Sequence, residues 1–213
     1  MKVTLKTTHY ILVIAMVNLL LKLLLIFRSA IPFSPGMVIN RAFDIVQDCT
    51  YLIPLVYLVY LLKFINQARP VVIAFIINCL FSALVMALGL FITRASNYVY
   101  FMIIGFFSFA ILINLEVQIF RIKHQVLTFP FRMYGLTVLA VIFIHLFNAM
   151  LLPLFQYKIL SGYNLLTILN KSFTLIYLLP QAALLFILYK TAEFLKQIRP
   201  DFEYIAPNLD DQV

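Results

Sequence analysis

Residues 133–157 read MYGLTVLAVIFIHLFNAMLLPLFQY and contain no Asp, Glu, Lys or Arg. A helix needs about 20 consecutive apolar residues to cross a bilayer, so this stretch is long enough. The helical period places its few polar residues on one face: Thr137, His145, Asn148 and Gln156. We therefore predict a membrane helix whose polar face points into a helix bundle.

The composition of the whole chain is typical of integral membrane proteins. Of its 213 residues, 64% are hydrophobic and 11% are charged, whereas about a quarter of the residues of soluble domains are charged. The expected partner is therefore the lipid bilayer of an inner or plasma membrane. The net charge of +8 would indicate nucleic acid binding in a soluble protein. Here most Lys and Arg lie at the ends of apolar stretches, where they face lipid headgroups, and we expect no nucleic acid partner.

The apolar stretches predict an all-α fold, namely a six-helix transmembrane bundle. We expect one membrane domain, residues 1–199, followed by a short acidic cytoplasmic tail, residues 200–213. In this prediction Arg69-Pro70 ends the tail of the second helix, and Pro180 lies inside the sixth. The six spans cover approximately residues 8–28, 43–64, 71–92, 98–120, 133–157 and 172–191.

The distribution of Lys and Arg predicts the orientation, because short cytoplasmic loops are enriched in these residues. With the N-terminus inside, the cytoplasmic set is Lys2, Lys6, Lys63, Arg69, Arg121, Lys123, Arg132, Lys190, Lys196 and Arg199. The outer set is the smaller one: Arg28, Arg41, Arg94, Lys158 and Lys171. This bias favours a cytoplasmic location for both termini.

Three charged residues cluster near the outer ends of the first two predicted helices. Lys22 lies inside the first span, where a charge costs about 2.5 to 3.5 kcal/mol unless it reaches the surface or a partner. Asp44 and Asp48 lie one helical turn apart near the start of the second span. We predict that Lys22 pairs with Asp48, in a cluster that joins the two helices or lines an outer vestibule.

Polar residues within the other spans are the candidates for binding a solute or an ion. Glu116 lies near the cytoplasmic end of the fourth span, where it can carry a proton, bind a cation, or extend toward Arg121 and Lys123 at the surface. His145 lies at mid-span and can bind a ligand or form a hydrogen bond between helices. The remaining candidates form either a central polar layer or helix-to-helix hydrogen bonds: Asn18, Asn78, Asn148 and Gln181.

Motifs of known enzyme chemistry are not found in the sequence. It has no Walker loop, no dinucleotide-binding glycine pattern, no HExxH and no G-x-S-x-G. Cys49 and Cys79 lie in apolar runs without metal-ligand spacing, and the three histidines fall on distant segments. We therefore expect no cofactor and no metal, and we favour a function other than catalysis.

The sequence favours a membrane protein that handles a small solute or ion, as a permease, a channel component or a solute-binding subunit. The first alternative is an accessory, assembly or sensory subunit, whose polar residues only join helices and whose basic loops bind a membrane or cytoplasmic protein. The second alternative is a lipid-modifying enzyme, because the chain contains acid and base groups within its spans: Lys22, Asp44, Asp48, Glu116 and His145.

Overall fold

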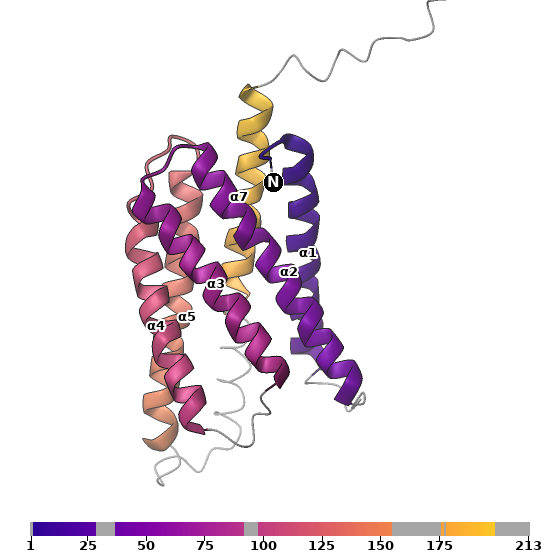
Figure 1. Cartoon of the computed structure of the whole chain (residues 1–213), viewed down its shortest axis with the longest axis vertical. Coiled ribbons are helices and arrows are strands. Elements are labelled where there is room, and N and C mark those ends of the chain that lie inside the picture. Colours follow the sequence, from indigo (N-terminus) through magenta and orange to yellow (C-terminus); the bar gives the residue numbers. More distant parts are fainter. Residues whose placement is uncertain (1, 29–36, 92–97, 155–175, 177, 199–213) are drawn as a thin grey trace, which may run out of the picture.

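The structure, a computed structural model, describes residues 2–28, 37–91, 98–154, 176 and 178–198. The described residues fold into helices joined by short turns, which confirms the predicted all-α class (Figure 1). The six helices are α1 (Leu5–Arg28), α2 (Met37–Phe64), α3 (Arg69–Phe91), α4 (Tyr98–Ile119), α5 (Thr128–Leu154) and α7 (Leu179–Ile198).

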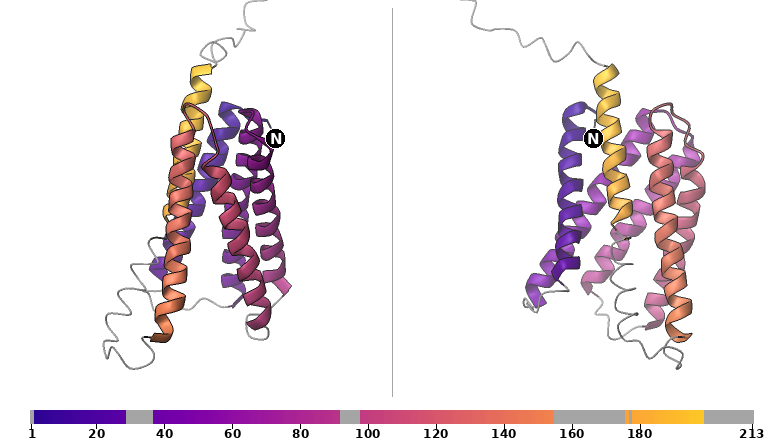
Figure 2. Two further views of the ribbon diagram at one scale, coloured as in Figure 1. Left: turned by 90° about the vertical axis from the view of Figure 1, so that its left-hand side faces the viewer. Right: turned by 180° about the vertical axis from the view of Figure 1, so that it is seen from behind.

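The helices form a closed ring. Each helix packs against the next one along the chain from α1 to α5, and α7 lies between α5 and α1 (Figure 2). The start of α1, the α2–α3 turn, the α4–α5 turn and the C-terminal end of α7 lie at the same end of the ring, which we call the turn end (Figure 1). Neighbouring helices are therefore antiparallel.

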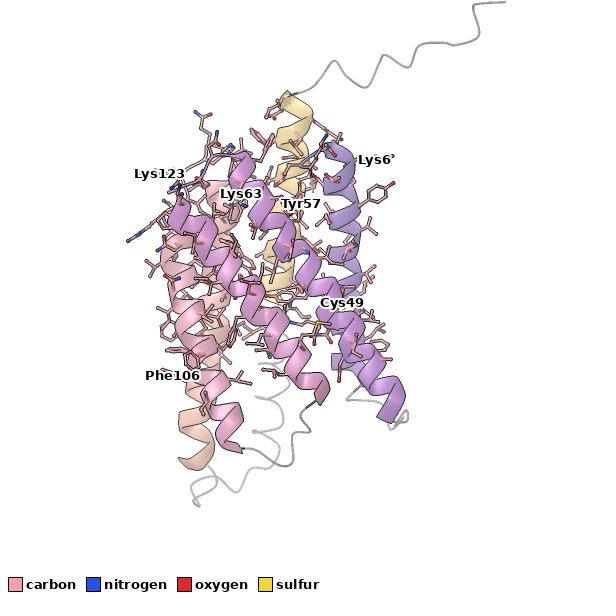
Figure 3. The ribbon with its side chains drawn as sticks, in the orientation of Figure 1. Lys6, Cys49, Tyr57, Lys63, Phe106 and Lys123 are labelled. Carbon is pink, nitrogen blue, oxygen red and sulfur yellow. The ribbon has the colours of Figure 1, made fainter. Side chains whose placement is uncertain are left out.

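Three of the helices are long and apolar enough to cross a membrane. They contain the stretches Leu5–Leu24, Ala42–Phe64 and Arg69–Leu88, and shorter apolar stretches occur in α4 and α5. Large apolar side chains also cover the outside of the ring, because Leu80 is 66% exposed and Phe106 is 71% exposed (Figure 3). An apolar outer surface of this kind is unfavourable in water, and it indicates membrane association.

Buried side chains gather toward the turn end of the ring. The largest fully buried ones include Tyr57, Phe75, Phe131 and Tyr134. The rings of Phe75 on α3 and Phe131 on α5 meet edge to face, with centroids 6.0 Å apart. Because α3 and α5 are not neighbours in the ring, this contact shows that aromatic side chains fill its interior.

The helix ends differ from the predicted spans at the prolines. Arg69 and Pro70 begin α3 instead of ending the tail of the preceding helix, and Pro180 lies in the first turn of α7 instead of its interior. The first turn tolerates proline because its backbone N–H groups have no partner within the helix. Pro130 occupies the same kind of position in α5, which starts at Thr128 before the predicted residue 133.

Two further ends depart from the predicted bounds. α2 begins at Met37, before the predicted start at residue 43, and contains Pro54 in its interior. α7 continues past Thr191 to Ile198. The predicted start of the sixth span, residues 172–175, and the predicted acidic tail, residues 200–213, lie outside the described residues.

The α2–α3 turn is fixed by a helix C-cap centred on Asn66. Asn66 has a φ of 52°, in the left-handed region that Asn adopts more easily than most residues. Its N–H donates to the carbonyl of Lys63 (3.1 Å), and the Gln67 N–H donates to the carbonyl of Leu62 (3.0 Å). This pair of bonds ends α2 and turns the chain into α3.

The side chain of Gln67 then joins this turn to the α4–α5 turn. Its Nε2 donates to the carbonyl of Lys123 (2.9 Å), and its Oε1 accepts from the Lys123 N–H (3.0 Å). The amide thus occupies both backbone groups of one residue on a distant turn. The two turns are held together at the turn end of the ring.

We expect Gln67→Ala to lower the free energy of unfolding in detergent by about 1 kcal/mol, because it removes two partly exposed hydrogen bonds. Gln125→Ala, on the exposed part of the α4–α5 turn, is the matched control and should have little effect. Denaturant titration followed by circular dichroism measures both. An equal loss in the two variants would contradict a specific role of the Gln67 side chain.

Candidate functional site

Glu116 on α4 is buried in the ring, with only 3% of its surface exposed. Neither carboxyl oxygen has a hydrogen-bond partner among the residues that the structure describes. Arg121 and Lys123, toward which the side chain could have extended, are exposed, and no ion pair joins them to Glu116 within the described part of the chain. The carboxyl group is therefore turned into the protein, away from the surface cations.

The carboxyl group of Glu116 lies directly against the backbone of α5 at Gly135. A Cβ atom at Gly135 would stand 2.6 Å from Glu116 Oε2 and 3.0 Å from Ile119 Cγ2. No real side chain fits at the first of these distances without displacing its neighbour. Gly135 is thus the residue that lets α4 and the carboxyl group approach α5 so closely.

Side chains from two more helices meet at the same place. Tyr134, which is 1% exposed, precedes Gly135 on α5, and its side chain interacts with that of Tyr51 on α2. Glu116 and Cys79 of α3 lie close enough to Tyr134 to interact with it electrostatically. We call these five residues the Glu116 cluster; they come from α2, α3, α4 and α5.

The Glu116 cluster favours a bound positive charge or a proton. Burying an ionised carboxylate without a partner is strongly unfavourable, and such groups are normally neutralised or paired. Tyr134 lies close enough to Glu116 to interact with it electrostatically, while Tyr51 and Cys79 lie near Tyr134. Among the described residues, no cluster of His, Cys, Asp and Glu could hold a metal ion. A buried carboxyl group of this kind can take up and release a proton or interact with a small cation.

The other predicted interior residues are distributed over several helices. Asn18, 2% exposed, donates from Nδ2 to the Gln47 carbonyl (2.8 Å) and to Thr50 Oγ1 (3.0 Å), so it joins α1 to α2. Asn78 on α3 and Gln181 on α7 are also buried. His145 and Asn148 belong to α5, but their side chains lie outside the described residues.

The structure brings the predicted ion-pair residues into one region. Lys22 Nζ lies 6.0 Å from the centroid of the Tyr51 ring, and it interacts electrostatically with Asp48. Asp44 and Asp48 influence each other as well, and both are exposed. The pairing of Lys22 with Asp48 stays a prediction. Tyr51 links this region to the Glu116 cluster, because its ring lies near Lys22 and its side chain interacts with Tyr134.

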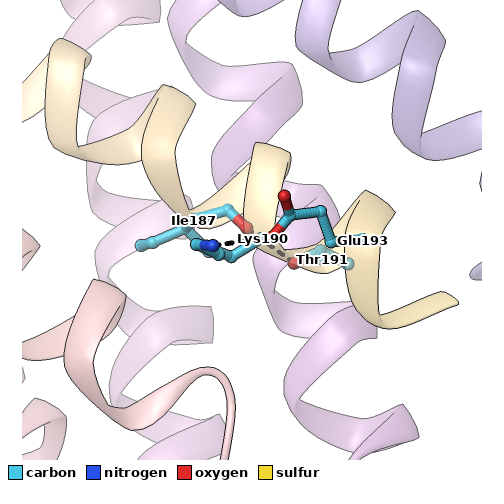
Figure 4. A network of polar contacts seen from close by, with 4 residues as sticks. All are labelled: Ile187, Lys190, Thr191 and Glu193. Atoms are coloured by element: carbon cyan, nitrogen blue, oxygen red, sulfur yellow. Dashed lines mark hydrogen bonds and ion pairs between the residues drawn. The ribbon is translucent and has the colours of Figure 1, made fainter. Parts of the chain in front are cut away.

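Glu193 on α7 differs from Glu116, because its carboxylate is partly exposed and has a cationic partner. Glu193 Oε2 forms a salt bridge of 2.7 Å with Lys190 Nζ, and both side chains are about one-third exposed (33% for Lys190, 38% for Glu193). Thr191 beside them donates its hydroxyl to the Ile187 carbonyl, at 2.8 Å (Figure 4). Glu193 is thus solvated and paired, which makes it a suitable control for Glu116.

Residues that the sequence analysis missed as site components are Tyr51, Tyr134, Cys79 and Gly135. Tyr residues near span ends are expected as interfacial anchors, and Tyr51 departs from that pattern because it lies inside its span. Gly135 is one of only five glycines in the chain. The position of Tyr51 and the rarity of glycine can both be seen in the sequence. Neither of them indicates which helix packs against these residues.

His124 organises the α4–α5 turn beside the start of α5. Its Nδ1 accepts from the backbone N–H of Leu127 (3.3 Å), and its backbone N–H donates to Thr128 Oγ1 (2.7 Å). The imidazole also meets the ring of Phe194 on α7 edge to face, with centroids 4.8 Å apart. Burial lowers the pKa of His124 below its ordinary value of 6.5. The neutral ring is therefore the form that the fold prefers.

Comparison with models of protein families, with curated proteins and with solved structures gave no match.

We expect Gly135→Ala to destabilise the protein by about 1 kcal/mol, the lower end of the overpacking range, because Glu116 Oε2 is the end of a flexible side chain that can move aside. Gly105→Ala on α4 is the matched control, because a Cβ there would meet nothing within 4 Å. Thermal unfolding in detergent measures both variants. Adding Glu116→Ala to Gly135→Ala should restore part of the loss, because it removes the clashing carboxyl group. Equal melting temperatures for the two glycine variants would contradict the close approach.

We also expect a specific acid sensitivity from His124. Because its folded pKa is lowered, the unfolded state binds more protons below pH 6.5, so this residue's contribution to stability is present above that pH and is lost as the pH falls. The melting temperature of His124→Ala should therefore fall less than that of the unmodified protein between pH 7.5 and pH 5.5. His9→Ala, at an exposed histidine, should follow the unmodified protein. Parallel pH profiles for all three proteins would exclude a contribution from His124.

Proposed function

We propose that the chain is a polytopic integral membrane protein in which all six helices cross the bilayer. Three helices are long and apolar enough by themselves, and the shorter apolar stretches of α4 and α5 belong to the same ring. The start of α1 and the end of α7 lie at the turn end together with most of the Lys and Arg residues. Since cytoplasmic loops are enriched in these residues, both termini are cytoplasmic in this proposal.

The protein, in this proposal, handles a small ion inside the ring, and the Glu116 cluster is where the ion binds. The observation that carries the proposal is the Glu116 carboxyl group, which is 3% exposed and has two oxygens without a hydrogen-bond partner in the described part of the chain. Acidic groups within membrane spans mark proton relays and ion pathways in many transporters. A proton or a small cation is the species that would neutralise this carboxyl group.

One set of contacts favours an accessory subunit instead. Thr8 on α1 hydrogen-bonds to Tyr57 on α2 in a fully buried position. Asn18, further along α1, joins the same two helices. Such bonds hold helices together without handling any solute. They do not include Glu116, however. The accessory function therefore accounts for the α1–α2 contacts and leaves the buried carboxyl group without a role.

The test is cation-dependent stability of the purified protein at constant ionic strength. If a cation binds at Glu116, one of the chlorides of lithium, sodium, potassium, magnesium or calcium should raise the melting temperature relative to choline chloride. A hundredfold excess over Kd corresponds to a stabilisation of about 2.7 kcal/mol. Glu116→Gln should abolish the rise, whereas Glu193→Gln, which alters a solvated carboxylate, should retain it.

If the Glu116 cluster binds a proton instead of a metal cation, we expect a different result in these measurements. No metal chloride then shifts the melting temperature, and infrared difference spectra show a protonated carboxyl band that disappears reversibly at high pH. That band should be missing in Glu116→Gln and present in Glu193→Gln. A cation effect that survives Glu116→Gln would contradict the assignment to the Glu116 cluster. The absence of both signals, with a second protein that co-purifies, would favour the accessory subunit.

A further inference from the structure

A groove lies on the outside of the ring at the turn end, where α2 passes into α3. It has a volume of about 400 Å³. Its polar part contains two cations, Lys63 and Arg69, and its apolar part belongs to the first turns of α3. The complete lining is Lys63, Asn66, Gln67, Arg69, Val72, Ile73 and Ile76.

The cations of the groove are available to a ligand. Lys63 and Arg69 are exposed, and neither forms an ion pair with an acidic side chain of the described residues. The wall between them is fixed, because the Asn66 cap sets the backbone and the Gln67 amide is held by both backbone groups of Lys123. The positive charges of Lys63 and Arg69 therefore lie on either side of the α2–α3 turn, whose backbone is held in place.

The apolar part of the groove continues along α3. Ile73 is 52% exposed, and it is followed on the same helical face by Ile77 (40%), Leu80 (66%) and Leu84 (53%). This stripe runs from the groove toward the other end of the ring. A ligand that fits the whole surface has an anionic head at the turn and a long apolar chain along α3.

The position of the turn agrees with a ligand from the bilayer itself. The apolar stretches of α2 and α3 end at Phe64 and begin at Arg69, so the groove falls at the depth of the lipid headgroups if these two helices cross the membrane. The surrounding surface is cationic, with Lys6, Arg121, Lys123 and Arg132 exposed. The carboxylate of Glu193, at the same end, is already paired with Lys190.

We propose that this groove binds an anionic phospholipid. Its phosphate lies between Lys63 and Arg69, and an acyl chain lies along Val72, Ile73 and the exposed face of α3. Charge attraction alone would also suit an acidic peptide or a nucleic acid. Neither of these needs an aliphatic stripe that continues beneath two cations, whereas an anionic phospholipid needs both parts.

Native mass spectrometry of the purified protein tests the proposal with two lipids of identical acyl chains, dioleoylphosphatidylglycerol and dioleoylphosphatidylcholine. The phosphatidylglycerol should bind more tightly. The double variant Lys63→Ala/Arg69→Ala should weaken its binding at least about tenfold, as expected from the loss of two cations next to an anionic lipid. Ile73→Gln, at an exposed position, should weaken the binding of both lipids.

The matched control is Lys6→Ala/Arg132→Ala, which removes the same charge outside the groove. It should retain most of the affinity for phosphatidylglycerol, and inorganic phosphate should not compete with the lipid, because phosphate lacks the acyl chain. Equal losses in the two double variants would overturn the groove in favour of a diffuse basic surface. Equal binding of the two lipids would overturn recognition of the anionic headgroup. Melting temperatures confirm that each variant is folded.

Discussion

The ring buries few polar groups, and each of them needs a partner because its surroundings offer almost none. Thr8 and Asn18 form hydrogen bonds with residues of α2. Each of these bonds joins two helices and so fixes their rotation about their own axes. Among the described residues, Gln118 Oε1, the Asn18 Oδ1 atom and both oxygens of Glu116 depart from this rule, and Glu116 packs against Gly135. The scarcity of polar partners inside the ring therefore explains both the bonds that join its helices and the buried carboxyl group that lacks a partner among the described residues.

The helical type of the described elements could be predicted, because apolar runs of about 20 residues leave few alternatives to a helix. Their ends could not. Pro70 and Pro180 are compatible with either the end or the start of a helix when only the neighbouring residues are known. What decides the case at Pro70 is the cap at Asn66, which ends α2 first. At α7 the helix begins just before its proline, at Leu179.

The sequence predicted single residues of the candidate site, but it did not predict which residues lie next to one another. Glu116, Asn78 and Gln181 were recognised because a polar residue stands out in an apolar run, and all three are buried. Their neighbours were not recognised, since the spacing of residues along one helix does not say which face of another helix lies opposite. Tyr51 and Tyr134 illustrate the difficulty, because each reads as an aromatic core residue until the ring places their hydroxyls together.

The closure of the ring by α7 has a consequence for biosynthesis. The chain is made from its N-terminus, so α1 is completed first, yet one of its two neighbours in the ring is α7, the last helix that the structure describes. During most of synthesis the flanks of α1 and α5 that later contact α7 have no partner from this chain. Assembly in the membrane therefore contains a late step, the docking of one helix into a seam that has stayed open. Loss of the C-terminal segment would remove the closing helix and leave an incomplete circle.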